Sequence, residues 1–143
     1  MNAIRKPKIT VTTSVNATID HVWNIWTEPK HVTNWNSASP DWHTPSAIND
    51  LRKGGRFTFR MEARDGSLGF DFGGTYDKVD PNKTIEYTMD DDRKVKVIFE
   101  NQTGQIVVTE TFEAEAENSL ELQQTGWQAI LNNFKKHVES NHF

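Results

Sequence analysis

Apolar and polar residues alternate strictly near the start of the chain, from Lys8 to Asn16. On one face of this segment lie Ile9, Val11, Thr13 and Val15. A period of two residues is typical of a strand that buries one face. The pattern therefore predicts that this segment is a first, half-buried strand.

The next residues follow a helical period. Thr18 is a suitable N-cap, and apolar residues then recur at helical spacing, at Ile19, Val22, Trp23 and Trp26. Pro29 fits the first turn of a second helix, whose apolar stripe is Val32 and Trp35. We expect two short helices in tandem, followed by a loop from Ser37 to Pro45.

Turn-forming residues punctuate the middle of the chain, and the segments between the turns have strand character. The turns are at residues 53–55, 65–66, 80–83, 90–92 and 101–104. The first of these strands is predicted from Ala47 to Arg52, and the last ends at Ala114. With the N-terminal strand, this gives seven strands. Gly73 and Gly74 lie within one of them, which indicates a bulge or a close approach to the backbone.

The last segment, from Asn118 to Glu139, has the pattern of a long amphipathic helix. Asn118 and Glu121 have the spacing of a capping box, and one side of the helix carries Leu122, Trp127, Ile130, Leu131, Phe134 and Val138. It is the one predicted element long enough to cover the apolar face of a curled sheet. The predicted fold class is therefore α+β: a curved seven-stranded antiparallel sheet around a C-terminal helix. The space between them is either filled by aromatic side chains or left as an apolar cavity.

Composition and charge exclude several functional classes. The chain of 143 residues has 16 Lys and Arg against 20 Asp and Glu, without the basic stripe that nucleic-acid binding requires. It has no cysteine, so it forms neither a disulfide nor a thiolate metal site. Neither a signal peptide nor an apolar run of membrane-spanning length is evident. We expect a soluble cytoplasmic protein with no membrane span.

Several stretches of the sequence resemble one superfamily. They are residues 35–39, 41–43, 50–55, 70–72 with 74–76, and 126–131. These stretches are similar to the START-like (polyketide cyclase and lipid-transfer) superfamily. Within it, they are closest to the family named for the C-terminal domain of the Hsp90 ATPase activator. The resemblance extends from Ile9 to about Val138, and its more specific motifs are the Leu51–Gly55 turn and the Gly126-Trp127 pair.

The resemblance implies a helix-grip fold, with residues 1–143 forming one START-like domain and a hydrophobic pocket between the sheet and the long helix. It also implies a range of functions: ligand carriage, cyclisation of polyketides, or contact with a chaperone in a stress response. The expected partner is a small hydrophobic molecule, with a chaperone as a possible alternative and without a cofactor. The expected assembly is a monomer or weak dimer. A fold of this kind does not by itself decide between these functions.

Aromatic residues are the main candidates for a ligand-binding wall, because the chain has five Trp and eight Phe. The candidates are Trp26, Trp35, Trp42, Phe57, Phe59, Phe70, Phe72, Tyr87, Phe112 and Trp127, with Leu131 beside them on the last helix. For any single one of them, packing in an ordinary core is the alternative. Rigid aromatic walls favour a flat, ring-bearing ligand over a flexible chain.

Glu110 is the candidate polar group, because it shares an apolar register with Ile106, Val108 and Phe112. An inward carboxylate would either serve a ligand or form an ion pair with a cation such as Arg60 or Arg52. The alternative is a shifted register in which Glu110 faces water and the inner face carries Val107, Thr109 and Thr111.

His43 is the second polar candidate, in the predicted loop between two prolines, where a histidine could transfer protons near neutral pH. In the leading hypothesis, His43 and Glu110 orient one polar end of a bound ligand. In the second hypothesis, the same two residues are the acid and base of a polyketide cyclase-like enzyme. A third hypothesis is a chaperone accessory protein that acts through its surface.

A metal site is not expected. His43, Asp50 and Glu110 could contribute ligands, but no second histidine has a suitable spacing. The remaining candidates, His21, His31 and His137, fall on the predicted helices and are expected to face outward.

Overall fold

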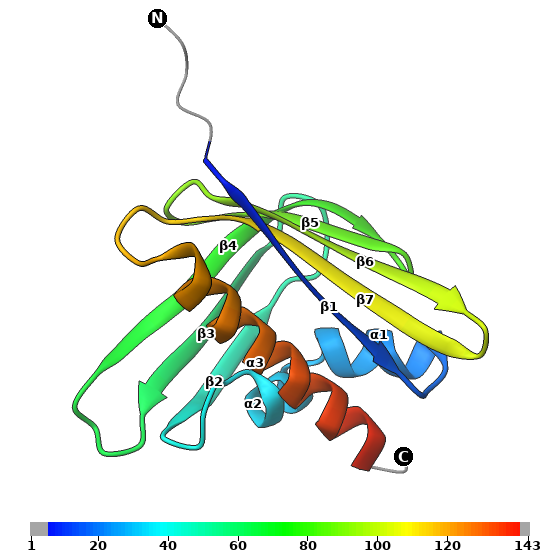
Figure 1. Cartoon of the computed structure of the whole chain (residues 1–143), viewed down its shortest axis with the longest axis horizontal. Coiled ribbons are helices and arrows are strands. Elements are labelled where there is room, and N and C mark those ends of the chain that lie inside the picture. The colour runs from blue at the N-terminus through cyan, green and yellow to red at the C-terminus, as the bar shows by residue number, and fades with distance from the viewer. Residues whose placement is uncertain (1–5, 141–143) are drawn as a thin grey trace, which may run out of the picture.

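One antiparallel sheet forms the body of the protein, as the computed structural model shows for residues 6–140 (Figure 1). Within this range its seven strands have the order β1-β7-β6-β5-β4-β3-β2. The strands are β1 (Lys8–Val15), β2 (Trp42–Asn49), β3 (Arg56–Ala63), β4 (Gly69–Asp80), β5 (Thr84–Met89), β6 (Lys94–Gln102) and β7 (Gln105–Glu113). The predicted meander of seven strands is therefore confirmed. Both ends of the predicted domain, 1–143, lie outside the described residues.

The predicted turns lie where the sequence placed them, and each of the five contains at least one residue with left-handed backbone. Gly66, between β3 and β4, has a φ of 79°, and Asn82, between β4 and β5, has a φ of 65°. Glycine and asparagine are the residues that adopt such angles at the least cost. These turns fix the register of the hairpins that lead to the cavity.

The three helices are α1 (Ile19–Thr27), α2 (Pro29–Trp35) and α3 (Leu120–Ser140). Thr18 caps α1 as predicted, since its Oγ1 accepts a hydrogen bond from the His21 N–H at 3.3 Å. For α3 the predicted cap is wrong by one residue, because the Leu122 N–H donates to Ser119 Oγ at 3.1 Å. Among residues 6–140, no helix is long and apolar enough to cross a membrane.

The start of β2 differs from the sequence prediction. Residues 42–45, predicted as part of a loop, belong to the strand, which ends at Asn49 and not at Arg52. A proline within a strand argues for a loop, yet Pro45 is tolerated here for two reasons. β2 is an edge strand, and its pairing with β3 is irregular between His43 and Ser46.

Gly73 and Gly74 do not form a bulge, because both pair regularly with β3. The irregularity in β4 falls between Tyr76 and Lys78. Close approach is the reason for Gly74: a Cβ there would lie 2.6 Å from the Thr88 carbonyl oxygen and 3.0 Å from the Phe57 ring. The absence of a side chain lets Phe57 pack against the sheet.

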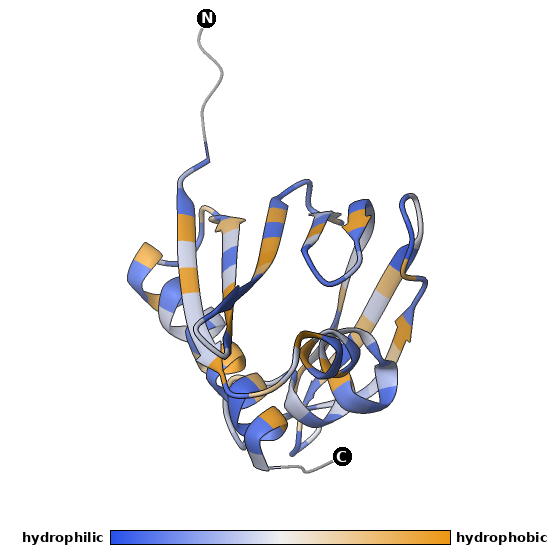
Figure 2. Ribbon diagram, turned by 90° about the vertical axis from the view of Figure 1, so that its right-hand side faces the viewer, coloured by the Kyte–Doolittle hydropathy of each residue, from blue (hydrophilic) through white to orange (hydrophobic). Residues whose placement is uncertain are grey.

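The core lies on the concave face of the curled sheet, where α3 packs against β1, α1 and α2. Hydrophobic and hydrophilic residues alternate along the strands, as a sheet with one buried face requires (Figure 2). On α3, Leu131, Phe134 and Val138 are buried as predicted. Leu122 is 60% exposed, and Gln123 is buried in its place. The apolar stripe of α3 is therefore shorter than predicted.

Candidate functional site

A cavity of about 320 Å³ lies on the concave face of the sheet, with α3 as part of its wall. Aromatic side chains dominate the wall, among them Trp35, Phe57, Phe59, Phe72, Tyr87 and Trp127. They come from α2, β3, β4, β5 and α3, so that the cavity exists only when sheet and helices are assembled. Ligand sites are typically concave and apolar with a few polar groups, and this cavity has that character.

Eight of the ten predicted aromatic residues line the cavity: Trp26, Trp35, Phe57, Phe59, Phe70, Phe72, Tyr87 and Trp127. The Phe72 ring is central to this group. Its centroid lies 6.4 Å from that of Phe59 in a stacked arrangement, and 6.2 Å from that of Trp127 in an edge arrangement. Phe72 thus links the sheet side of the cavity to the helix side. Phe57, another of the predicted aromatic residues, shares the inward register of Phe59.

Three other predicted residues lie outside the lining. Phe112 is fully buried behind the wall, where its ring stacks on Trp127 with centroids 3.8 Å apart. Leu131 belongs to the packed core. Trp42 contacts Phe70, whose ring is 5.9 Å away and does line the cavity. These residues support the wall or its edge.

Glu110 faces inward, as its register predicts. It pairs with Val11 on β1 and with Val97 on β6, and only 7% of its surface is exposed. No described residue donates a hydrogen bond to its carboxylate. The predicted cations are engaged elsewhere, since Arg52 pairs with Asp50 and Arg60 pairs with Glu62 and Asp71.

Burial without a cation changes the chemistry of Glu110. Desolvation disfavours a carboxylate, and it raises the pKa of Glu110 from its ordinary value to about 8. At neutral pH the side chain is therefore mainly a neutral carboxylic acid, which can donate a hydrogen bond into the cavity.

Two tyrosines also line the cavity, in different states. The Tyr76 hydroxyl donates to Asn49 Oδ1 at 2.6 Å, so its proton is already engaged. The Tyr87 hydroxyl has no hydrogen-bond partner among residues 6–140. Burial raises the pKa of Tyr87 well above its ordinary value, with a smaller contribution from the nearby Glu110. Tyr87 is therefore a second donor available to a ligand.

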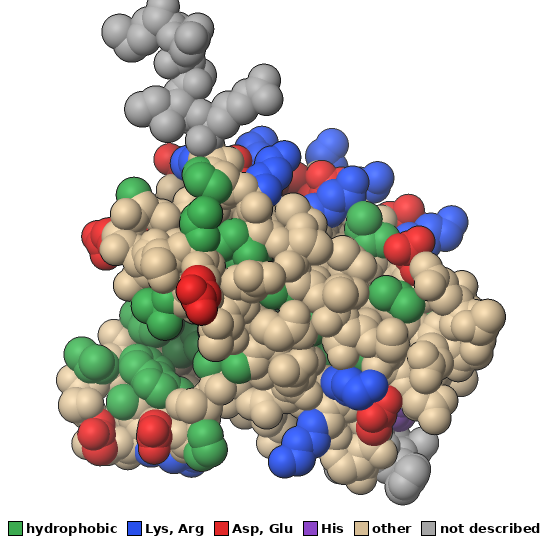
Figure 3. All heavy atoms as spheres, viewed as in Figure 1, with side chains coloured by type: hydrophobic (Ala, Val, Ile, Leu, Met, Phe, Trp, Pro, Cys, Tyr) green, Lys and Arg blue, Asp and Glu red, His purple; other side chains and the backbone are tan. Residues whose placement is uncertain are grey.

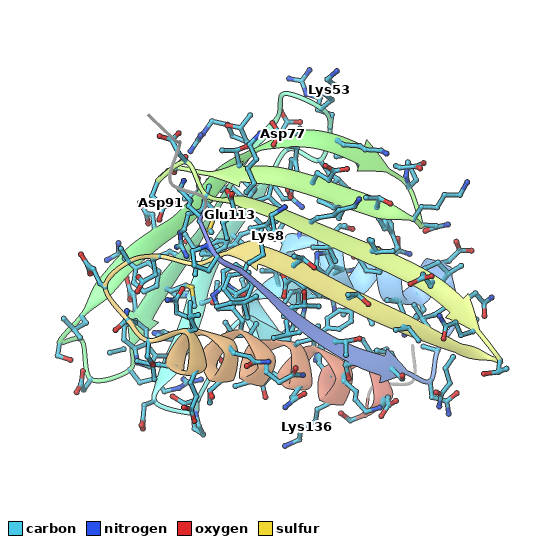
Figure 4. The ribbon with its side chains drawn as sticks, turned by 45° about the horizontal axis from the view of Figure 1, so that its top comes forward. Lys8, Lys53, Asp77, Asp91, Glu113 and Lys136 are labelled. Atoms are coloured by element: carbon cyan, nitrogen blue, oxygen red, sulfur yellow. The ribbon has the colours of Figure 1, made fainter. Side chains whose placement is uncertain are left out.

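Arg93 is a cavity residue that sequence reasoning missed. Its Nε donates to Asp91 at 2.8 Å and its Nη1 to the Glu113 carbonyl oxygen at 3.3 Å. Asp91 and Glu113 lie at the same end of the sheet (Figure 4). The signal was present in the sequence, because Arg93 is in the inward register of Val95 and Val97.

His43 is not brought together with Glu110. It lies in β2 opposite Glu62, with Nε2 3.9 Å from Glu62 Oε1, and it does not line the cavity. Alternation along the strand gives the reason: Trp42 pairs with the buried Ala63, so the next side chain points to the outer face. The predicted loop position of His43 at the pocket rim is wrong.

Two of the three helix histidines, His31 and His137, differ from the prediction that they face outward. His31 Nδ1 of α2 lies 3.2 Å from His137 Nε2 of α3. Desolvation lowers the pKa of both residues. The pair joins the two helices, but across residues 6–140 no three His, Cys, Asp or Glu side chains are grouped to hold a metal ion.

The cavity opens between the first turns of α3 and the β3–β4 hairpin, where hydrophobic side chains surround a hollow (Figure 3). Leu68 and Phe70 of the hairpin are 65% and 48% exposed. Leu120 and Leu122, at the start of α3, are 50% and 60% exposed. Because Phe70 and the nearby Glu115 line the cavity, these exposed apolar side chains flank its opening.

Comparisons with known proteins agree with this fold. The family model described as Activator of Hsp90 ATPase homolog 1-like protein matches residues 16–139. A solution structure of an AHSA1-like protein from Aeromonas hydrophila is 42% identical, with 96% of this chain and 99% of that chain covered and a TM-score of 0.89. A solution structure from Cytophaga hutchinsonii is 50% identical over 95% of this chain and 97% of that one, with a TM-score of 0.82.

A more distant likeness shows the fold alone. A crystal structure of a protein from Chromobacterium violaceum is 20% identical over 94% of this chain and 99% of that chain, with a TM-score of 0.83. None of the curated proteins compared with this chain matches it.

Proposed function

Because the chain belongs to the family of Activator of Hsp90 ATPase homolog 1-like proteins, we propose that it uses the family's fold to bind a small, hydrophobic, ring-bearing molecule. The ligand would occupy the cavity between the sheet and α3. The observation that carries this proposal is an aromatic-walled cavity that contains an unpartnered acid, Glu110.

The energetics of Glu110 support a ligand over a simple core. A buried acid without a partner costs free energy, which a hydrophobic residue of similar size would avoid. A ligand that hydrogen-bonds to the acid would offset this cost. The cavity volume of about 320 Å³ is also within the range of roughly 300 to 1,000 Å³ that is usual for small-molecule sites.

The two alternative functions receive less support. The cyclase hypothesis relied on His43 and Glu110 acting together, and His43 lies outside the cavity lining. The chaperone hypothesis would be favoured by an exposed apolar face away from the cavity. Instead, Leu68, Phe70, Leu120 and Leu122 flank its opening, which is consistent with a ligand entrance.

A chemical-shift screen tests the proposal. Amide signals of the protein are followed during titration with a small-molecule library, and shifts are expected around Phe72, Tyr87 and Trp127. Ile130→Trp should abolish binding, because Ile130 lines the cavity and the larger ring would fill it. Asn132→Trp, on the exposed side of the same helix, is the matched control. Undiminished binding by Ile130→Trp would contradict the proposal.

A further inference from the structure

We propose that the cavity selects ring-bearing ligands that carry a neutral, hydrogen-bond-accepting oxygen, such as the carbonyl of an aryl ketone. The donors to this oxygen are the carboxylic acid of Glu110 and the hydroxyl of Tyr87. This inference rests on the proposed function, and it names the polar group that the cavity recognises.

The sheet places the two donors on one face and in one cavity. Glu110 is on β7 and is opposite Val97 of β6, which in turn is opposite Ile85 of β5. Tyr87 is two residues further along β5, so its side chain points to the same face as that of Ile85. Although only 7% of Glu110 and 8% of Tyr87 is exposed, neither has a polar atom that is both inaccessible and unpartnered, so their oxygens face the open space of the cavity.

Neither donor is engaged within the described part of the chain. No described side chain or backbone group hydrogen-bonds to the Glu110 carboxyl or to the Tyr87 hydroxyl, whereas Tyr76 in the same cavity is held by Asn49. Buried polar groups are usually hydrogen-bonded. Two unpartnered groups in one aromatic cavity therefore point to a ligand that supplies the missing acceptor.

The charged and titratable groups around Glu110 determine its protonation state. From the neighbouring strands and α3 it faces the uncharged Val11, Val97, Trp127 and Ile130. The other titratable groups of the lining are Tyr76, Tyr87, Arg93 and Glu115. Arg93 is paired with Asp91, and Glu115 accepts two hydrogen bonds from Asn118.

Glu110 therefore has no compensating cation, and it is the neutral acid that faces the ligand. Its raised pKa of about 8 agrees with this arrangement. A carbonyl or ether oxygen accepts from a neutral acid directly. A protonated amine would pair with Glu110 only after Glu110 had lost its proton. Its positive charge would also lie in the same cavity as the guanidinium of Arg93, which disfavours binding.

Three probes with the same ring separate these possibilities: 2-acetylnaphthalene, 2-ethylnaphthalene and 1-(2-naphthyl)ethylamine. The ketone should bind about tenfold more tightly than the hydrocarbon, since one buried hydrogen bond contributes about that factor. In Glu110→Leu this advantage should shrink to the part that the Tyr87 hydroxyl still supplies. In Glu110→Gln it should persist within about threefold, because the amide still donates. Tyr87→Phe should weaken ketone binding severalfold without changing hydrocarbon binding.

Ketone binding should also depend on pH. As Glu110 ionises between pH 6.5 and 9.5, the ketone should lose most of its roughly tenfold advantage over the hydrocarbon, given the pKa of about 8. Tyr87 stays protonated in this range, because its pKa lies well above the ordinary value. Hydrocarbon binding, and ketone binding by Glu110→Gln, should stay constant over the same range. Circular dichroism at each pH shows that the variants are folded.

The outcomes distinguish this inference from the function on which it rests. Equal affinity for ketone and hydrocarbon would overturn the inference and leave cavity binding intact. Tightest binding of the amine, with loss in Glu110→Gln, would also overturn it. If wild-type protein bound none of the three probes, both the inference and the proposed function would be contradicted.

Discussion

At the scale of single residues, burial of the Glu110 carboxyl group costs free energy of folding, but it also provides a donor for a bound ligand. Its neighbours across the sheet are Val11 and Val97, which offer neither charge nor hydrogen bond. A leucine in this position would pack without desolvating a carboxyl group. The cost is smallest when the acid is protonated, so the stability of the protein is coupled to pH.

We expect Glu110→Gln to remove a pH-dependent loss of stability. The folded pKa of Glu110 is raised from 4.5 to about 8, so the folded state binds a proton that the unfolded state has released. This contribution to stability is complete below pH 4.5 and is lost as pH rises to about 8, by up to about 1.4 kcal/mol per pH unit. Urea unfolding at several pH values should show that the stability of the variant, relative to that of the wild type, increases as pH rises. A constant difference would contradict the burial of an unpaired acid.

Trp127 and Phe134 provide a second test at this scale. Trp127 lines the cavity and stacks on Phe112, whereas Phe134 is fully buried between Trp26 and Trp35. We expect Phe134→Ala to cost about 3 to 5 kcal/mol and Trp127→Ala about 2 kcal/mol, because one side of Trp127 already faces open space. Urea unfolding measures both. Equal losses would show that Trp127 is an ordinary core residue.

At the scale of elements, α3 consists of two unlike halves. From Leu131 onward it buries Leu131, Phe134 and Val138 against the core, whereas before Leu131 it buries only Gln123. The Gln123 side chain fixes the start of the helix through hydrogen bonds with Glu115 and Asn118. The first half of α3 thus borders the cavity, and Trp127 and Ile130 there are only partly buried against the core.

Gly126 lies in this first half, and we expect Gly126→Ala to stabilise the protein by about 1 kcal/mol. Alanine has the higher helix propensity, and no atom lies within 4 Å of the position its Cβ would take. Thermal or urea unfolding measures the gain. Gly74→Ala is the matched control and should be destabilising, because its Cβ would meet the Thr88 carbonyl at 2.6 Å. A loss of stability in Gly126→Ala would show that this glycine has a conformational role in α3.

The elements also show which features the sequence could predict. Periodicity sufficed for β1, the two short helices and the hairpins, because each is specified by its own residues. Periodicity failed at β2, because pairing with β3 overrides the signal from Pro45. The predicted loop position of His43 was wrong for the same reason. The aromatic lining and inward Glu110 followed from alternation. The absence of a cation near Glu110 could not be predicted, since it depends on how distant arginines pair.

At the scale of the whole molecule, the His31–His137 contact joins α2 to α3 beside the core. Burial lowers the pKa of both histidines below 6.5, so stability due to their neutral forms is lost as pH falls below that value. We expect the double variant His31→Gln, His137→Gln to lose less stability than the wild type when the pH is lowered from 7.5 to 5.5. Urea midpoints at the two pH values measure this gain. An unchanged difference would show that the pair does not titrate with unfolding.

The shape of the ligand should reflect the rigidity of the whole cavity. Its walls are aromatic rings fixed by contacts with one another, such as Phe59 with Phe72. We therefore expect a planar polyphenol to bind more tightly than a fatty acid of similar size, as measured by titration calorimetry. Tighter binding of the fatty acid would contradict an aromatic wall as the basis of recognition.

The most direct test of ligand binding in the cavity is the location of a bound molecule by isotope-filtered nuclear Overhauser effects. An unlabelled ring-bearing ligand is added to labelled protein, and contacts between its protons and the protein side chains are recorded. We expect contacts with the rings of Phe72, Tyr87 and Trp127, which line the cavity and neighbour one another through Phe72. Contacts confined to exposed side chains such as Ile48, with none to these three rings, would contradict the proposal.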